Sequence, residues 1–266
     1  MSVFVDTHCH VDQYPDPVGV LKAAAAANVV TIAVTDLPSA FQRLALRLGK
    51  KPSVRVALGF HPMRAAVAPP LEFALFTRLL DRVEYVGEVG LDGSRAGRPT
   101  LRVQERLFER LLSQSRLTTK VLTVHSRGAE SETIRRLAEA QVTAILHWYS
   151  GPLKYIETAA AAGLWFSVNP AMLRSKNGQR IVAALPRERV VTETDGPYTK
   201  HAGRTSVPTD IPSVVAGLAR IWGEAPDAAR QLVFDNMAAI AAAARAAPTR
   251  GRDCGSATAT RAPARS

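Results

Sequence analysis

Short apolar runs alternate with longer amphipathic stretches along most of this chain. The runs are mostly β-branched, as buried parallel strands are, and they cover residues 3–7, 29–34, 54–59, 85–87, 121–124, 144–146, 164–168 and 190–192. The stretches between them repeat apolar residues at helical spacing and cover residues 18–27, 41–48, 71–80, 101–117, 134–140, 153–162 and 179–185. Two more helical stretches, 214–222 and 228–245, come after the last run. The pattern predicts a repeated strand–helix unit.

Eight strand-like runs, each followed by a helical stretch, predict an α/β fold of the TIM (β/α)8 barrel type. A doubly wound open sheet is the alternative, but it usually has a glycine-rich turn after its first strand. Here the first strand runs into residues 6–10, which contain no glycine. We therefore expect one barrel domain over residues 1–245.

The end of the chain has a different composition. Residues 246–266 are rich in Ala, Pro, Gly, Ser, Thr and Arg and contain no aromatic or branched aliphatic residue. Such a segment cannot bury enough apolar surface to order itself, so we expect a disordered tail. Cys254 lies in this tail and is expected to be an exposed, inert thiol.

Composition and charge narrow the class of protein. Hydrophobic residues make up 47% and charged residues 21% of the chain, which is an ordinary globular composition. Two cysteines give no disulfide framework, and the first residues show no signal-peptide pattern. Apolar stretches stop well short of the roughly 20 residues of a membrane span. We expect a cytoplasmic protein with no membrane association. The net charge of +11 favours a polyanionic partner.

The placement of histidine is the first chemical signal. Five of the six histidines directly follow the predicted strands one, three, five and six. In a TIM barrel these strand ends open onto one face, which holds the active site. Histidine is also the commonest metal ligand in proteins. The sequence therefore predicts a metal site to which the strand ends bring His8, His10, His61, His125 and His147.

Carboxylates join the histidines at two more strand ends. His8 and His10 are two residues apart on a strand, so both side chains point to the same side. Glu88 ends the fourth strand, and Glu193 and Asp195 follow the eighth. A buried carboxylate is costly unless it is paired or binds a cation. For Glu88 taken alone, an ion pair with a nearby arginine is the alternative.

The candidate ligands are more numerous than one four-coordinate ion needs. The predicted ligands are His8, His10, Glu88, His125, His147 and Asp195. Six nitrogen and oxygen donors suit two divalent ions roughly 3.5–4 Å apart, and Glu88 is the natural bridge between them. Such donors suit Zn²⁺, Mn²⁺, Fe²⁺ or Mg²⁺, and their spacing does not choose among these metals.

The candidate residues sit in six ordered blocks of sequence, DTHCHVD at 6–12, GFHP at 59–62, GEVGLD at 87–92, HSR at 125–127, HWYSG at 147–151 and ETDGPY at 193–198. In this order they resemble the TatD family of metal-dependent deoxyribonucleases, which are amidohydrolase-like barrels. The resemblance spans roughly residues 3–240, and six blocks in family order make it specific.

The resemblance implies hydrolysis of phosphodiester bonds by a water that two metal ions activate. It assigns one ion to the first histidine pair and the strand-eight aspartate, a second ion to the two later histidines, and the bridge to the glutamate. It also implies that His61 contacts the scissile phosphate, that Glu193 belongs to the catalytic residues and that Asp195 acts as general base.

Basic residues near these blocks are candidates for binding the substrate phosphate. Arg127 follows His125 and could clamp a phosphate through two hydrogen bonds, with a structural salt bridge as the alternative. Lys200 and Arg204 follow the eighth strand and are further candidates. His201 lies in the same stretch, either as a solvated loop residue or as a phosphate contact.

Two stretches depart from the family pattern. The family usually has an aromatic pair after Gly-Leu-Asp, where this chain has Gly93, Ser94 and Arg95. It also usually has an Arg-Asn-x-Pro block after strand eight, which residues 200–208 replace here. Both stretches would border the substrate groove, so they leave the choice of substrate open while the predicted metal ligands are complete.

Four short segments point to a narrower resemblance: DQYPDP at 12–17, GLDGS at 90–94, WFSV at 165–168 and TDGP at 194–197. They are similar to the TatD-like component of Qat anti-phage defence systems. That resemblance implies partner proteins, namely an ATPase, a QueC-like enzyme and an accessory subunit.

Three functions compete at this stage. The first is a two-metal nuclease that acts on DNA, with single strands or frayed ends favoured. The second is a hydrolase that attacks an amide, lactone or ester on the same centre, because a cation pair activates water for those reactions equally well. The third is a scaffold subunit of a defence complex that binds nucleic acid with little turnover. The complete ligand set argues against the third.

Overall fold

The computed structural model describes residues 3–248. The strands of the barrel are β1 (Phe4–Cys9), β2 (Val29–Ala33), β3 (Val54–Val56), β4 (Tyr85–Gly90), β5 (Val121–His125), β6 (Thr143–Leu146), β7 (Trp165–Val168) and β8 (Val190–Thr192). They form two sheets, β1-β2-β3 and β4-β5-β6-β7-β8, in which every neighbouring pair is parallel. The order of the strands in space therefore follows their order along the chain.

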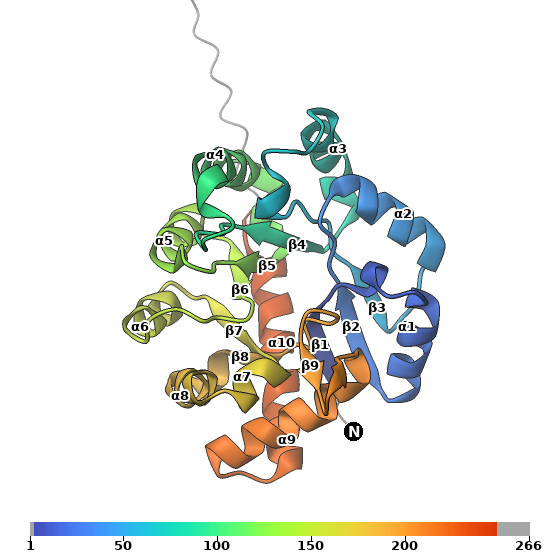
Figure 1. Ribbon diagram of the computed structural model, residues 1–266, viewed down its shortest axis with the longest axis vertical. Helices are drawn as coiled ribbons and strands as arrows, with labels where there is room; N and C mark the ends of the chain where they lie inside the picture. Colours follow the sequence, from blue (N-terminus) through green and yellow to red (C-terminus); the bar gives the residue numbers. More distant parts are fainter. Residues whose placement is uncertain (1–2, 249–266) are drawn as a thin grey trace, which may run out of the picture.

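Two junctions close the sheets into a ring. Leu58, just after β3, forms a parallel bridge with Val86 of β4. Between β8 and β1, the Thr7 hydroxyl donates to the carbonyl of Thr192 at 3.0 Å, and the Thr192 hydroxyl donates to the carbonyl of Val5 at 2.5 Å. Figure 1 shows the resulting ring of strands inside a layer of helices. The predicted α/β TIM barrel is confirmed.

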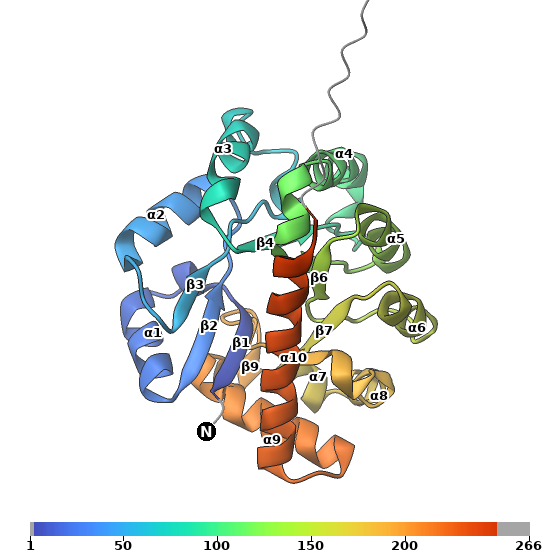
Figure 2. The ribbon, with the colours of Figure 1, turned by 180° about the vertical axis from the view of Figure 1, so that it is seen from behind.

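The helices of the outer layer are α1 (Pro17–Ala26), α2 (Pro38–Leu48), α3 (Leu71–Leu79), α4 (Leu101–Leu112), α5 (Glu130–Ala140), α6 (Lys154–Ala161), α7 (Pro170–Arg174), α8 (Lys176–Ala184) and α9 (Ile211–Trp222). The last helix, α10 (Pro226–Ala246), instead lies lengthwise across the back of the ring of strands (Figure 2). Among residues 3–248, none of the helices combines the length and apolar character that a membrane span requires.

Helix α10 closes one end of the barrel. Met237, Ile240 and Ala244 of this helix pack in one apolar cluster with inward-facing strand residues such as Val5 and Ile145. A larger cluster fills the space between the strands and the outer helices. Because α10 covers the barrel from behind, the carboxyl ends of the strands stay open on the opposite face, which is where TIM barrels carry their active sites.

The structure corrects two expected elements. The single helix expected over 101–117 is wrong, since α4 ends at Leu112 and a separate 3-10 helix covers Ser115–Thr119. Gln114 takes an extended conformation between them, which lets the chain turn toward β5. The stretch after β8, expected as a loop, contains a hairpin of β9 (Lys200–His201) and β10 (Arg204–Thr205).

Helix α10 ends at Ala246, one residue beyond the expected barrel boundary. Most of the expected disordered tail over 246–266, with Cys254, lies outside the described residues.

Candidate metal centre

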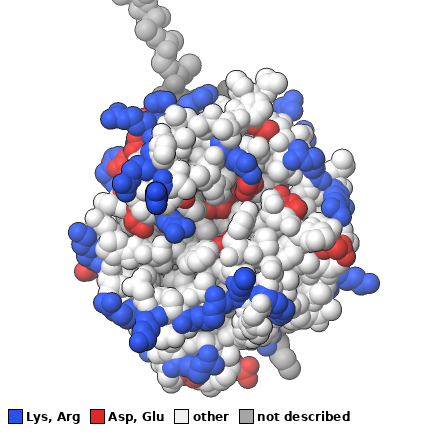
Figure 3. Space-filling model, viewed as in Figure 1, with Lys and Arg blue, Asp and Glu red and all other residues white. Residues whose placement is uncertain are grey.

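The strand-end residues predicted from the sequence meet at the open end of the barrel. They surround a cavity of about 550 Å³, whose walls include His10, His61, Glu88, His125, His147 and Asp195. His8 is fully buried beneath them. Figure 3, in the same view as Figure 1, shows a hollow near the middle of this face, with acidic side chains inside it and basic side chains around its rim. Donors at the ends of six strands thus converge on one place.

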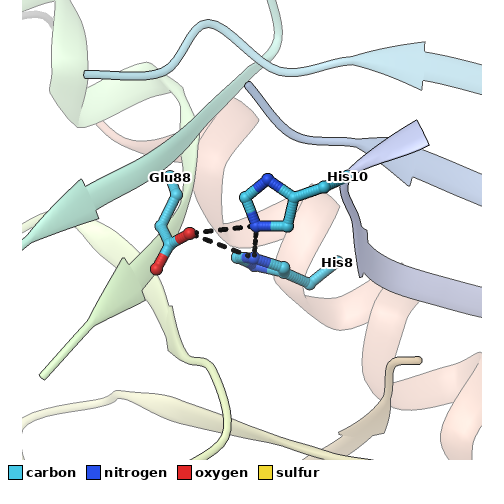
Figure 4. Close-up of side chains that lie close together, drawn as sticks. All are labelled: His8, His10 and Glu88. Carbon is cyan, nitrogen blue, oxygen red and sulfur yellow. Dashed lines mark hydrogen bonds and ion pairs between the residues drawn. The ribbon is translucent and has the colours of Figure 1, made fainter. Parts of the chain in front are cut away.

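Glu88 occupies the centre of the cluster, and its two carboxylate oxygens face different histidines. The Oε2 atom lies 3.5 Å from Nε2 of His8 and 3.1 Å from Nε2 of His10. Figure 4 shows the two rings directed at this carboxylate. Asp195 joins the same side of the site, with its Oδ1 atom 3.8 Å from both Nε2 atoms.

The other oxygen of Glu88, Oε1, faces the remaining three imidazoles. It lies 3.3 Å from Nε2 of His61, 2.6 Å from Nδ1 of His125 and 2.9 Å from Nε2 of His147. The last two nitrogen atoms are 3.4 Å from each other. Glu88 therefore separates two groups of ligand atoms, as a bridging carboxylate does in a two-metal site.

Two of the histidines are oriented by direct hydrogen bonds on their far ring nitrogens. Nδ1 of His8 lies 2.6 Å from the hydroxyl of Thr123, and Nε2 of His125 lies 2.8 Å from Oδ2 of Asp92. A metal-binding histidine almost always uses its second nitrogen in this way, which fixes the tautomer and the orientation of the ring. In His125 the contact leaves Nδ1, the atom beside Glu88, to bind a cation.

The other two histidines face carboxylates at a longer distance. Nδ1 of His10 lies 3.6 Å from Asp36, and Nδ1 of His147 lies 3.8 Å from Glu193. Both nitrogens are buried without a hydrogen-bond partner of their own. His8, His10, His125 and His147, the four histidines predicted as ligands, thus each present one nitrogen to the centre and the other to an oxygen of the surrounding protein.

The charge states fit cation binding. Burial alone would raise the pKa of Glu88, but the positive charges of His61 and His147 hold it well below its usual range. Burial lowers the pKa of His8 to about 3, so that its ring is neutral and keeps a lone pair for a metal. Burial raises the pKa of Asp195 to about 7. Despite their burial, contacts with Glu88 and its neighbours raise the pKa of His10, His125 and His147, so the carboxylates here favour positive charge beside them. A bound cation would supply that charge in place of protons, and Zn²⁺, Mn²⁺ and similar ions accept mixed imidazole and carboxylate donors.

Asp195 reaches the cavity because the chain after β8 is tied to β1. Its backbone N–H donates to the carbonyl of His8 at 2.8 Å. Asp6, buried in β1, accepts hydrogen bonds from the Thr194 backbone at 2.9 Å and from the Thr194 hydroxyl at 2.6 Å. Burial raises the pKa of Asp6 to about 8. The first strand and the residue that follows it therefore carry two predicted ligands, His8 and His10, and the strand positions a third.

Glu193 lies behind the centre rather than on the cavity wall. It is fully buried and accepts hydrogen bonds from Ser167, from the Asn169 side chain at 3.0 Å and from the Trp148 backbone at 3.0 Å. A cluster of His8, His147 and Glu193 also has the spacing of a metal site. Three donors already occupy this carboxylate, and its Oε2 atom lies 3.8 Å from Nδ1 of His147.

The predicted phosphate-binding residues separate into two groups. Arg127 and His61 line the cavity. Lys200 and Arg204 lie on the β9–β10 hairpin, and neither is among the described residues that line the cavity. The guanidinium of Arg204 instead binds both carboxylate oxygens of Asp210, at 2.5 and 2.9 Å. His201 is half-buried in the same hairpin.

Sequence reasoning missed three residues of the site. Asp36 lines the cavity beside His10 and also binds Arg64 at 3.1 Å. It follows β2 as the other acidic residues follow their strands, so the same rule could have found it. Asp92 ends the GEVGLD block at 87–92, but its contact with His125 depends on how the loop after β4 folds back. Tyr198, 59% exposed, forms the outer wall over His10.

Comparison with known proteins identifies the family of this site. The family model described as TatD related DNase matches residues 5–241. A Homo sapiens protein named Deoxyribonuclease TATDN3 is 32% identical over 213 residues, which cover 73% of this chain and 77% of that protein. The uncharacterized metal-dependent hydrolase MJ1582 of Methanocaldococcus jannaschii is 26% identical over 241 residues, covering 88% and 94% of the two chains.

A solved structure gives the same result. The crystal structure of YJJV, a TatD homologue from Escherichia coli K12, superposes with a TM-score of 0.79 at 25% identity, covering 89% of this chain and 97% of that one. The chain belongs to the TatD family of metal-dependent hydrolases, and its barrel is the fold of that family.

Proposed function

We propose that this protein hydrolyses phosphodiester bonds of DNA with two divalent cations, Mg²⁺, Mn²⁺ or Zn²⁺, held on either side of Glu88. One observation carries the proposal. The two carboxylate oxygens of Glu88 face two separate groups of imidazoles, at distances between 2.6 and 3.5 Å. A single ion would need only one of these groups, whereas a bridging carboxylate serves both.

The distances support one division of the residues between the two proposed ions. His8, His10 and Asp195 would hold one ion, His125 and His147 the other, and Glu88 both. Divalent ions at such sites supply Lewis acidity toward a phosphoryl oxygen and make water nucleophilic near neutral pH.

The cavity wall supplies the remaining groups of the reaction. The carboxylate of Asp195, which faces the cavity, accepts the proton of the attacking water as general base. His61 is placed to hydrogen-bond a phosphoryl oxygen as charge develops on it. Arg127 pairs with the phosphate of the bound substrate. Glu193 orients His147 and does not touch the substrate.

Charge and relatives support DNA as the substrate. The net charge of +11 favours a polyanion, and the basic side chains around the cavity lie where a substrate backbone would pass. The human relative is named a deoxyribonuclease. The open strand-end cavity suits a single strand or a frayed end more readily than an intact duplex.

A defence role is a further part of the proposal. It rests on the four sequence segments that resemble the TatD-like component of Qat systems, and it implies a cytoplasmic protein that works with an ATPase, a QueC-like enzyme and an accessory subunit. A plaque assay tests it: cells that express the chain with these partners should lose phage protection when Asp195→Asn is introduced. Equal protection by the variant would contradict a nuclease role in defence.

The activity itself is tested on end-labelled single-stranded and double-stranded DNA. We expect metal-dependent cleavage by the wild type and none by the His125→Ala/Asp195→Asn double variant. Cleavage that persists in the double variant would come from contamination and would overturn the proposal. Hydrolysis of model esters or amides without DNA cleavage would favour a different hydrolase on the same centre. DNA binding without any turnover would indicate a scaffold.

A further inference from the structure

Three arginines lie on two neighbouring loops at the open end of the barrel. Arg127 comes from the loop after β5 and lines the cavity. Arg95 and Arg98 come from the loop between β4 and α4, and both are exposed. We call these three residues the arginine tract.

The two loops of the arginine tract are locked together. The backbone N–H of Gly93 donates to the carbonyl of Arg127 at 2.8 Å. A Cβ atom at Gly93 would lie only 2.2 Å from the carbonyl oxygen of Gly128, so the two loops approach at a distance that a side chain would prevent. The arginine tract therefore has a defined position beside the cavity.

Asp92 connects this rim to the metal centre. Its Oδ2 atom lies 2.8 Å from Nε2 of His125, and its Oδ1 atom accepts the Ser94 backbone N–H at 2.9 Å. Gln104 of α4 binds the Asp92 backbone at 2.7 Å and the Gly97 carbonyl at 2.9 Å. One hydrogen-bonded unit thus positions both a predicted metal ligand and the loop that carries Arg95 and Arg98.

The guanidinium groups of the arginine tract have no acidic partner. Within residues 3–248, no ion pair involves Arg95, Arg98 or Arg127. Two other arginines near the cavity are paired, Arg64 with Asp36 and Arg204 with Asp210. The positive charges of these three arginines are therefore not neutralised by a neighbouring carboxylate, and they lie on two connected loops beside the cavity.

We propose that the arginine tract binds backbone phosphates of the same DNA strand that is cut in the cavity, and so selects polynucleotides over small phosphodiesters. This inference rests on the proposed function and adds to it the side on which the strand leaves the site. Arginine suits the role because its planar guanidinium forms paired hydrogen bonds with phosphate oxygens. Such contacts position a strand without reading its sequence.

The test compares Arg95→Gln/Arg98→Gln with a matched control, Arg47→Gln/Arg82→Gln. Arg47 and Arg82 are also exposed, and neither has an ion pair in the described part of the chain. Arg47 lies in the last turn of α2 and Arg82 ends the 3-10 helix Leu80–Arg82, so both precede the amino ends of strands, β3 and β4, on the side away from the cavity. The substrates are a single-stranded oligonucleotide and bis(4-nitrophenyl) phosphate. We expect Arg95→Gln/Arg98→Gln, the tract variant, to raise the KM for the oligonucleotide relative to the KM for the small diester about 10-fold. The control variant should leave this ratio unchanged.

Salt dependence gives a second readout. The affinity of the Asp195→Asn protein for the labelled oligonucleotide should fall as the salt concentration rises. Each phosphate contact with a single strand contributes about 0.7 to the slope of log affinity against log salt concentration, so replacing Arg95 and Arg98 should make this slope shallower by about 1.4. Arg95→Lys/Arg98→Lys, which keeps the charge, should retain most of the slope.

The outcomes separate this inference from the proposed function. If the wild type cleaves neither substrate, the proposed function fails, and the binding slopes still decide whether the arginine tract holds a strand. If the wild type cleaves both substrates and the tract variant matches the control in KM ratio and slope, the inference about the arginine tract is overturned while the nuclease proposal stands.

Discussion

The imidazoles around Glu88 depend on atoms one contact further out. Asp92 accepts a hydrogen bond from His125, and despite its burial the bonds from His125 and Ser94 hold the pKa of Asp92 below its usual value. This ionised carboxylate keeps a proton on Nε2 and directs Nδ1 toward Glu88.

Asp92→Asn therefore removes the charge of this partner while keeping its size. We expect metal affinity or metal-dependent activity to fall about 10–100-fold, the usual effect of losing an outer partner of a metal ligand. Titration of the purified apoprotein with Mn²⁺, followed by activity, measures the change. Asp227→Asn, an exposed site in the first turn of α10, is the matched control. An unchanged Mn²⁺ dependence for Asp92→Asn would show that His125 needs no carboxylate.

Glu193→Gln separates an orienting role from a catalytic one. Glu193 touches Ser167, Asn169 and the Trp148 backbone but not the cavity. We expect weaker metal binding, with kcat largely restored when the metal is in excess, because the amide can still hold part of this network. Activity that stays lost at saturating metal would instead show that Glu193 takes part in the chemistry.

The candidate ligands could be predicted from sequence because one rule covers them. Residues that follow parallel strands meet at one end of a barrel, so His61, His147 and Asp195 needed only correct strand positions. The contacts that orient these ligands do not follow the rule. Thr123 lies inside β5, and its contact with His8 depends on the register between distant strands.

At the scale of elements, the apolar pattern predicted where the strands and helices lie along the chain, but it did not predict the residues at which they begin and end. The helical stretch expected at 134–140 begins at Glu130 in the structure, because the first turn of α5 is polar and carries no apolar periodicity. The short helix α7 was not expected, since five residues are too few to show a helical repeat.

Helix α10 makes a testable contribution to stability. The buried Asn236 side chain donates to the carbonyls of Arg187 at 2.8 Å and Val190 at 2.7 Å, which connects the helix to the start of β8. Asn236→Ala leaves both carbonyls without this donor, so we expect a loss of about 1–3 kcal/mol in the free energy of unfolding.

Urea denaturation measures this loss. Gln231→Ala on the exposed side of α10 is the control, and it should change the unfolding free energy by less than about 0.5 kcal/mol. Equal effects of the two substitutions would show that the contact of Asn236 with β8 adds no stability.

At the scale of the whole molecule, metal binding should stabilise the barrel. The candidate ligands come from β1, β4, β5 and the segments after β6 and β8, so a bound ion connects parts that are distant along the chain. A ligand at about 100 times its Kd adds about 2.7 kcal/mol to stability.

For a protein of this size that gain corresponds to an increase in Tm of roughly 5–10 °C. We expect chelation to lower the Tm by this amount and added Mn²⁺ or Zn²⁺ to restore it, as followed by circular dichroism. The His125→Ala/Asp195→Asn protein should show little response to either treatment. A wild-type Tm that changes with neither chelator nor added metal would contradict a metal centre at these residues.

The central claim is that two cations bind on opposite sides of Glu88. Anomalous diffraction from crystals of the Mn²⁺-loaded protein tests it most directly. We expect two peaks, one beside His8, His10 and Asp195 and one beside His125 and His147, with Glu88 between them. A single peak at saturating Mn²⁺, or an ion held by His147 and Glu193 instead, would contradict the account.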